Sequence, residues 1–235
     1  MLDAINEVDW GAIPGHPDWY EPARAARGLR ALADAANLAE AAEASSLLGG
    51  GGIVHGHSAA VFPAAAVATP LLLDIAQQGS PVARDAALGL VDEALSSYPH
   101  GGYTRVTTSY GVAVPICCVI AHQLRARSVL LAGLGKRGRG LLAGAAEHWR
   151  LEIRECVADS NDTAAFGALA GCFPSGMHAA ELHAGGEVTV LDAVALEYPP
   201  VDGSVEAWLR VTEWNPAELP PGAVLFPAEC GERVH

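Results

Sequence analysis

Two segments of this chain repeat one pattern, and this repeat constrains the fold more than any other feature. Residues 66–76 read AVATPLLLDIA and residues 111–121 read GVAVPICCVIA, so that Pro70 and Pro115 are 45 positions apart. A fainter copy, RAARGLRALA, has Arg27 in place of the proline. A period of about 40–47 residues is typical of helix-pair repeats, so the pattern predicts an α-solenoid.

The residues between the two prolines carry the signals of a helix pair. Pro70 lies in an apolar segment with a four-residue spacing, and Gly79 is placed to end that helix. Ser80 and Pro81 then supply an N-cap and a proline in the first turn of the next helix. The apolar stripe of this second helix consists of Ala87, Leu90, Val91, Ala94 and Leu95.

The sequence changes in character after residues 185–186, a pair of glycines. Before this pair we expect further helices over residues 116–122, 127–134, 140–153 and 163–172. After it, residues 187–198 and 205–214 are rich in Val and Thr, which favour strands, and a third short strand follows. A helix over residues 187–197 stays open as the alternative. We therefore predict a mostly α domain over residues 1–185, with a short β-rich C-terminal appendage over residues 186–235 packed on it.

Several short motifs also point to a family. The stretch VDWGAIP at residues 8–14, the run IVHGHS at residues 53–58 and the triplet AVP at residues 113–115 resemble the first three repeats of small HEAT-repeat proteins of actinomycetes. The resemblance spans about residues 8–175 and implies a HEAT-like α-solenoid of about three to four helix pairs. Some members of this family are immunity proteins, so it also implies a protein-binding module that neutralises a toxin.

Charge and composition restrict the partners. The chain has 14 Lys and Arg against 27 Asp and Glu, a net charge of −13. Nucleic-acid binding needs clustered basic residues, so we expect no nucleic-acid partner and favour a basic protein partner such as a nuclease toxin. The sequence has neither a signal-peptide pattern nor an apolar stretch long enough to span a bilayer, which predicts a cytoplasmic protein without a membrane partner.

The cysteines give no indication of a metal centre in the sequence. There are five, an odd number without a repeated spacing or a CxxC pair. Two of them are adjacent in an apolar run, where a cysteine usually acts as a small buried hydrophobic residue. This pattern favours reduced thiols, and we expect neither a cofactor nor a cysteine-bound metal.

Two histidine-containing loops are the most suggestive candidates for chemistry. His55 and His57 follow a run of four glycines, and His100 occupies the corresponding loop of the next repeat, beside Tyr98 and Tyr103. Equivalent loops of a solenoid emerge on one face, so these side chains are expected to lie together.

Three uses of these loops remain open. The imidazoles could act as general acids and bases, bind a metal with His100 or His122 as a third ligand, or simply cap helix ends. An enzyme acting on a small molecule (a lyase, isomerase or cyclase) is therefore the alternative function. Its catalytic residues would be His55, His57, His100 and Tyr103, and its substrate-binding residues would be Tyr98, Ser58 and His122.

Overall fold

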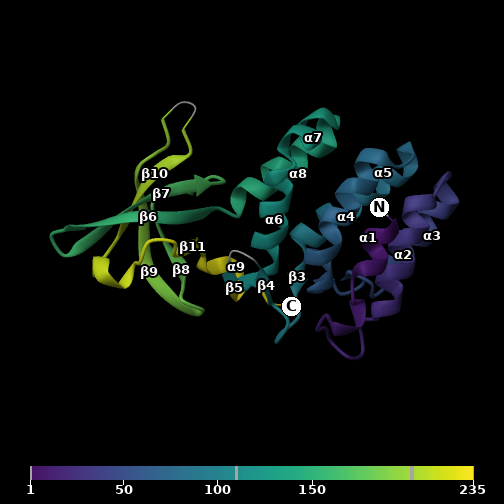
Figure 1. Cartoon of the computed structure of the whole chain (residues 1–235), viewed down its shortest axis with the longest axis horizontal. Helices are drawn as coiled ribbons and strands as arrows, with labels where there is room; N and C mark the ends of the chain where they lie inside the picture. Colours follow the sequence, from purple (N-terminus) through teal and green to yellow (C-terminus); the bar gives the residue numbers. More distant parts are fainter. Residues whose placement is uncertain (1, 109–110, 202–203, 235) are drawn as a thin grey trace.

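The protein consists of a helical part followed by a closed β-barrel (Figure 1). The structure is a computed structural model that describes residues 2–108, 111–201 and 204–234. The barrel forms one end of an elongated molecule, and the helices form the other. None of the helices in the described part of the chain has the length and apolar character needed to cross a lipid bilayer.

Helices build most of the first 147 residues. They are α1 (Leu2–Glu7), α2 (Pro22–Asp34), α3 (Leu38–Gly49), α4 (Ala64–Gln78), α5 (Pro81–Ser96), α6 (Ile116–Ala126), α7 (Ser128–Gly133) and α8 (Gly135–Glu147), with a 3-10 turn, η1, at Trp10–Ala12. Short strands lie between them, namely β1 (Val54–His55), β2 (Ala60–Val61), β3 (Tyr98–Pro99) and the hairpin β4 (Arg105–Thr108) and β5 (Gly111–Pro115). One hydrophobic core joins the helices and continues beneath the barrel end through Phe226.

The predicted helix pair is confirmed as α4 and α5. Gly79 caps the end of α4, and the Ser80 hydroxyl accepts a hydrogen bond from the backbone N–H of Ala83 at 3.2 Å. The five residues of the predicted apolar stripe in α5 are all buried. The short helix expected over residues 127–134 is also present, as α7.

Pro70 lies inside α4, and the carbonyl oxygen that it leaves without a helical partner is bound by a side chain of α6. A proline within a helix lacks the N–H that would bind the carbonyl oxygen four residues earlier, here that of Ala66. The side-chain amide of Gln123 donates to this oxygen at 2.8 Å. By contrast, Pro115 ends strand β5 and caps the start of α6. The two prolines therefore occupy different structural positions, and the sequence repeat between them is not a structural repeat.

Six antiparallel strands close the barrel in the order β10-β7-β6-β11-β8-β9. They are β6 (Arg150–Asp159), β7 (Asp162–Ala170), β8 (Met177–Ala184), β9 (Glu187–Tyr198), β10 (Glu206–Val211) and β11 (Val224–Pro227), with a 3-10 turn, η2, at Pro216–Glu218 and a final helix α9 (Ala228–Glu232). Inward-facing side chains such as Leu151, Leu182 and Leu225 fill its interior as a second core. The strands predicted in residues 187–198 and 205–214 are confirmed as β9 and β10.

The closed barrel shows that the predicted fold class, a mostly α HEAT-like α-solenoid with a short β-rich appendage, is wrong. Its first strand begins at Arg150, so residues 150–185, which we assigned to the mostly α domain, contain β6, β7 and β8. The predicted helix over residues 163–172 is strand β7, in which buried and half-buried residues alternate. Alanine and glycine occupy both faces of β7 and hide this two-residue period in the sequence. The expected helix over residues 140–153 ends at Glu147 as α8.

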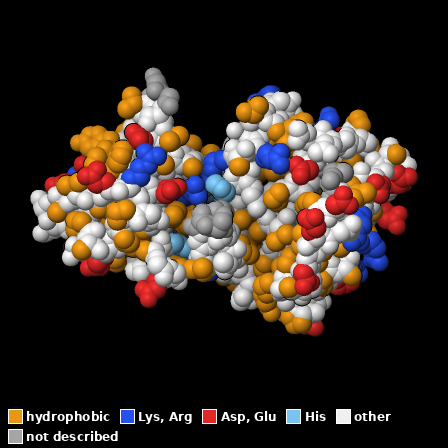
Figure 2. All heavy atoms as spheres, viewed as in Figure 1, with side chains coloured by type: hydrophobic (Ala, Val, Ile, Leu, Met, Phe, Trp, Pro, Cys, Tyr) orange, Lys and Arg blue, Asp and Glu red, His pale blue; other side chains and the backbone are white. Residues whose placement is uncertain are grey.

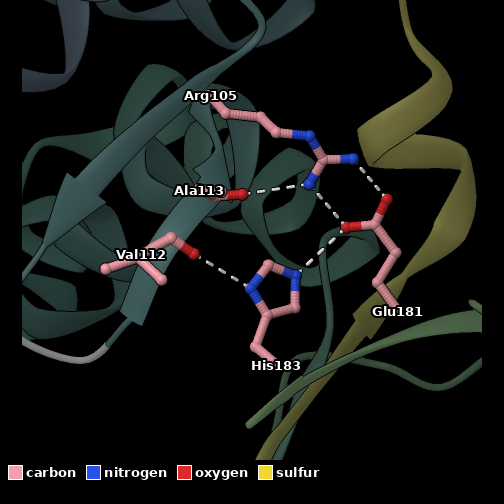
Figure 3. Close-up of polar contacts among 5 residues, drawn as sticks. All are labelled: Arg105, Val112, Ala113, Glu181 and His183. Carbon is pink, nitrogen blue, oxygen red and sulfur yellow. Dashed lines mark hydrogen bonds and ion pairs between the residues drawn. The ribbon is translucent and has the colours of Figure 1, made fainter. Parts of the chain in front are cut away.

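A buried ion pair fixes the barrel to the helical part (Figure 3). Arg105 of β4 donates two hydrogen bonds to the carboxylate of Glu181 on β8, at 2.8 and 2.5 Å, and a third to the carbonyl oxygen of Ala113. The ring of His183 lies between the Glu181 carboxylate, at 3.1 Å, and the carbonyl oxygen of Val112, at 3.2 Å. The Glu181 side chain is only 3% exposed, so these partners, and not water, must stabilise its negative charge.

Removal of Arg105 is expected to destabilise the protein strongly. In Arg105→Ala the buried carboxylate of Glu181 loses its strongest partner, which costs about 3–5 kcal/mol in free energy of unfolding. Denaturant unfolding measures this loss. Arg154→Ala is the matched control, because the Arg154–Glu206 pair is about half exposed and should contribute less than about 1 kcal/mol. Equal losses in the two variants would contradict the role of the buried pair.

The effect of Arg105→Ala should also depend on pH. Burial alone would raise the pKa of Glu181, but the hydrogen bonds from Arg105 and His183 outweigh it and hold this pKa below its usual value of 4.5. A lowered carboxyl pKa stabilises the fold above the unfolded pKa, and this stabilisation is lost as the pH falls through the folded pKa. The stability difference between wild type and Arg105→Ala should therefore shrink below about pH 4.5.

Candidate functional site

A small sheet brings the two predicted histidine loops together. Strand β1 pairs antiparallel with β2, and β2 pairs in parallel with β3, with Ala60 opposite Tyr98. His55 ends β1 and His100 follows β3, so the two loops lie on either side of the shared partner strand β2. The loops are neighbours because of this strand pairing, not because of the solenoid stacking from which we predicted it.

The rings of these loops gather around Trp19, and we call them the ring cluster: His16, Trp19, His55, His57 and His100. The ring of Trp19 stacks on that of His55, with centroids 5.3 Å apart, and meets that of His100 edge-on at 4.7 Å. The His16 and His100 rings lie 4.3 Å apart, and those of His55 and His57 lie 6.1 Å apart. These contacts bring together three of the predicted catalytic residues, His55, His57 and His100, and add two residues that the prediction missed.

Ser58 belongs to the same loop as His55. Its hydroxyl lies 2.8 Å from Nδ1 of His55, and both side chains are half-buried. The following residue, Ala59, has a positive φ of 51°, a conformation that is uncommon outside glycine. The loop thus holds a serine and an imidazole in a fixed hydrogen-bonded geometry.

The other predicted site residues lie elsewhere or point elsewhere. Tyr98 is 47% exposed, and the guanidinium carbon of Arg233 lies 4.7 Å from the centroid of its ring. Tyr103 is half-buried, and its backbone N–H donates to the carbonyl oxygen of His100. His122 lies on α6, where burial and the charges of Arg150 and Arg125 lower its pKa.

A second cluster joins four side chains of metal-ligating types from three distant parts of the sequence. We call Cys117, Cys118, His148 and Cys230 the thiol cluster. Their ligand atoms all lie within 4.8 Å of one another, and all four residues are buried. Among the described residues this is the one group of three or more potential ligands that lies so close together, and none of the ring-cluster histidines belongs to such a group.

Local structure explains how each residue reaches the thiol cluster. Pro115 caps α6, which places Cys117 and Cys118 in the first turn of that helix. His148 caps the end of α8, where Arg125 donates to its carbonyl oxygen at 3.0 Å, and the His148 Nδ1 lies 3.2 Å from the Cys230 sulfur. Cys230 lies on α9, directly after the last barrel strand.

The three thiols differ in their tendency to ionise. Hydrogen bonds from Cys118 and Cys230 hold the pKa of Cys117 well below its usual range, against the effect of burial. Burial raises the pKa of Cys118 well above its usual range, and hydrogen bonding to Cys117 raises that of Cys230. Cys117 is thus the thiol of the cluster that ionises most readily. Thiolate is the form of cysteine that binds metals.

Sequence reasoning missed this cluster because the cysteine pattern contains no local zinc motif. Cys117 and Cys118 are adjacent, which we interpreted as apolar packing, and Cys230 lies 112 positions after Cys118. Only the fold brings α6, the end of α8 and α9 together. The remaining cysteines lie apart from the cluster, with Cys156 half-buried and Cys172 exposed.

Comparisons with known proteins add no assignment. No protein-family model matches this sequence, and neither a curated protein nor a solved structure is significantly similar to it. The resemblance to HEAT-repeat proteins thus receives no support from them, and the solenoid that it implied is overturned by the barrel.

Loss of the Ser58 hydroxyl should destabilise the folded conformation of the loop that carries His55. In Ser58→Ala the half-buried Nδ1 of His55 loses its partner, and we expect the free energy of unfolding to fall by about 1 kcal/mol. Chemical denaturation measures the change. Ser46→Ala is the control, because Ser46 only donates to a carbonyl oxygen within α3 and alanine is a better helix former. An equal loss in both variants would show that the loop is not held by this bond.

Proposed function

We propose that this protein binds one zinc ion through Cys117, Cys118, Cys230 and His148. The observation that carries the proposal is the convergence of three sulfurs and one imidazole nitrogen within 4.8 Å in a buried position. At a Zn–S distance of 2.3 Å, the sulfurs of a tetrahedral site lie about 3.8 Å apart, so only a small contraction is needed.

The ligand types support zinc over the other common metals. Calcium and magnesium take oxygen ligands, whereas thiolates with an imidazole in tetrahedral geometry are typical of zinc. The lowered pKa of Cys117 suits a divalent cation, since the positive charge would offset the cost of a buried thiolate. Four protein ligands leave no open position, which is the pattern of a structural zinc site.

Such an ion would join three elements at the junction of the two parts. Cys117 and Cys118 belong to α6, His148 follows α8, and Cys230 belongs to α9 at the end of the barrel. Zinc would therefore hold the end of the barrel against the helical core. A basic protein partner, favoured by the net charge of −13, remains a separate prediction. Figure 2 shows acidic side chains spread over both parts on the face drawn.

The enzyme alternative keeps one supporting observation. Three of its four proposed catalytic residues, His55, His57 and His100, gather at the ring cluster. The fourth, Tyr103, contributes a backbone contact to His100. The zinc proposal is independent of this cluster, since no residue is common to both.

The protein should bind one equivalent of zinc, and each cluster residue should be needed. We expect elemental analysis to give one zinc per chain, and Co²⁺ substitution to give sulfur-to-metal charge-transfer absorption with the visible bands of a tetrahedral site. Cys117→Ser, Cys118→Ser, Cys230→Ser and His148→Ala should each weaken binding by more than the roughly 10–100-fold typical of losing a supporting residue. Cys156→Ser and Cys172→Ser are the matched controls and should bind zinc normally. A stoichiometry unaffected by all four cluster substitutions would refute the proposal.

Zinc should also stabilise the fold, because the four ligands come together only in the folded chain. At a free zinc concentration 100 times the dissociation constant, the free energy of unfolding should rise by about 2.7 kcal/mol. Denaturant unfolding with zinc and with a chelator measures this difference. Cys172→Ser should retain the gain and Cys230→Ser should lose it. A gain of the same size in Cys230→Ser would mean that zinc stabilises the protein from another place.

A further inference from the structure

A pocket of about 430 Å³ adjoins the thiol cluster on one side. We call it the α5–α8–α9 pocket, because its walls come from the end of α5, from α8 and from α9. Two cluster residues, His148 and Cys230, line it, whereas Cys117 and Cys118 do not. A smaller pocket of about 180 Å³ also borders α9 but contains none of the four cluster residues. The cluster therefore adjoins the larger of these two pockets through His148 and Cys230.

The charged residues of this pocket are mostly acidic. Asp92, Glu147 and Glu229 contribute three carboxyl groups to its lining, and Arg233 contributes one positive charge. The guanidinium of Arg233 lies over the Tyr98 ring at 4.7 Å and donates to the carbonyl oxygen of Ser96 at 3.0 Å. These contacts hold the positively charged side chain of Arg233 against the α5 wall of the pocket.

We infer that the α5–α8–α9 pocket is the route by which a divalent cation reaches and leaves the thiol cluster, with the three carboxylates drawing it in and Arg233 restricting passage. This inference rests on the proposed zinc site. It adds that the zinc is exchangeable, because two of its four buried ligand residues, His148 and Cys230, also line this pocket. His148 and Cys230 are the ligands that an entering ion meets first.

Electrostatics predicts that the pocket controls the rate of zinc uptake. Clefts lined by charge of one sign raise the association rate of an oppositely charged ligand by about 10–1000-fold. The carboxylates lie outside the group of four ligands, so they should affect association more than the final coordination. Arg233 carries the same sign of charge as the ion and should have the opposite effect.

Zinc uptake by the metal-free full-length protein tests the route. Stopped-flow mixing with Zn²⁺, followed by competition with a zinc-sensitive dye, gives the association rate. We expect Glu147→Gln/Glu229→Gln to slow uptake by about tenfold at low salt, with the difference shrinking as salt screens the charges. Arg233→Met should accelerate uptake. In both variants the stoichiometry should remain one zinc per chain.

The control changes the net charge equally but far from the pocket. Glu43→Gln/Glu187→Gln removes two exposed carboxylates on α3 and β9 and should leave the rate near that of the wild type. Uptake rates equal in wild type, the pocket variants and the control would overturn the route while leaving the zinc site standing. If the wild type binds no zinc at all, the proposed function fails, and the inference fails with it.

Discussion

The buried carboxylate of Glu181 is the constraint on which the junction of this protein depends. A charge that is 3% exposed must be compensated, and the compensation comes from Arg105 of a hairpin in the helical part. Because Glu181 lies on barrel strand β8, this pairing defines how the barrel sits on the helices. Replacing Arg105 and Glu181 by two apolar residues would remove the cost of burying charge. It would also remove the directional contact that selects one orientation of the barrel on the helices.

The position of the thiol cluster follows from the same contact. A Cβ at Gly231 would collide with the Glu181 carboxylate and with Arg105, so α9 can lie against the ion pair only because that position is glycine. Cys230 is the preceding residue, and this close approach brings its sulfur to Cys117 and Cys118 on α6. The ion pair and the proposed zinc site therefore both involve α9, through Gly231 and Cys230 respectively.

The sequence predicted the parts of this protein that local signals determine. Gly79, Ser80 and the apolar stripe of α5 define the α4–α5 pair through capping and helical spacing, which need no distant partner. The loops carrying His55 and His100 were also found, although β2–β3 pairing is the actual cause of their proximity. The barrel was missed because its strands are stabilised by partners far along the chain. Strand β7 has alanine and glycine on both faces, so its sequence shows no two-residue period. Its inward face is defined only in the folded barrel, where it packs beside Leu151 of β6 and Leu209 of β10.

The last residues of the chain connect the two clusters. From Cys230 the chain continues to Arg233, which packs on Tyr98, and to Val234, which lies within van der Waals reach of Gly101. Tyr98 and Gly101 flank His100, a member of the ring cluster. An ion bound at Cys230 would add a further restraint on the helix that carries this tail, beside the hydrogen bond from Arg233 to the carbonyl oxygen of Ser96. The acidic pocket beside Cys230 and the ring cluster are therefore only two residues apart along the chain, because Tyr98 lines the pocket and His100 belongs to the ring cluster.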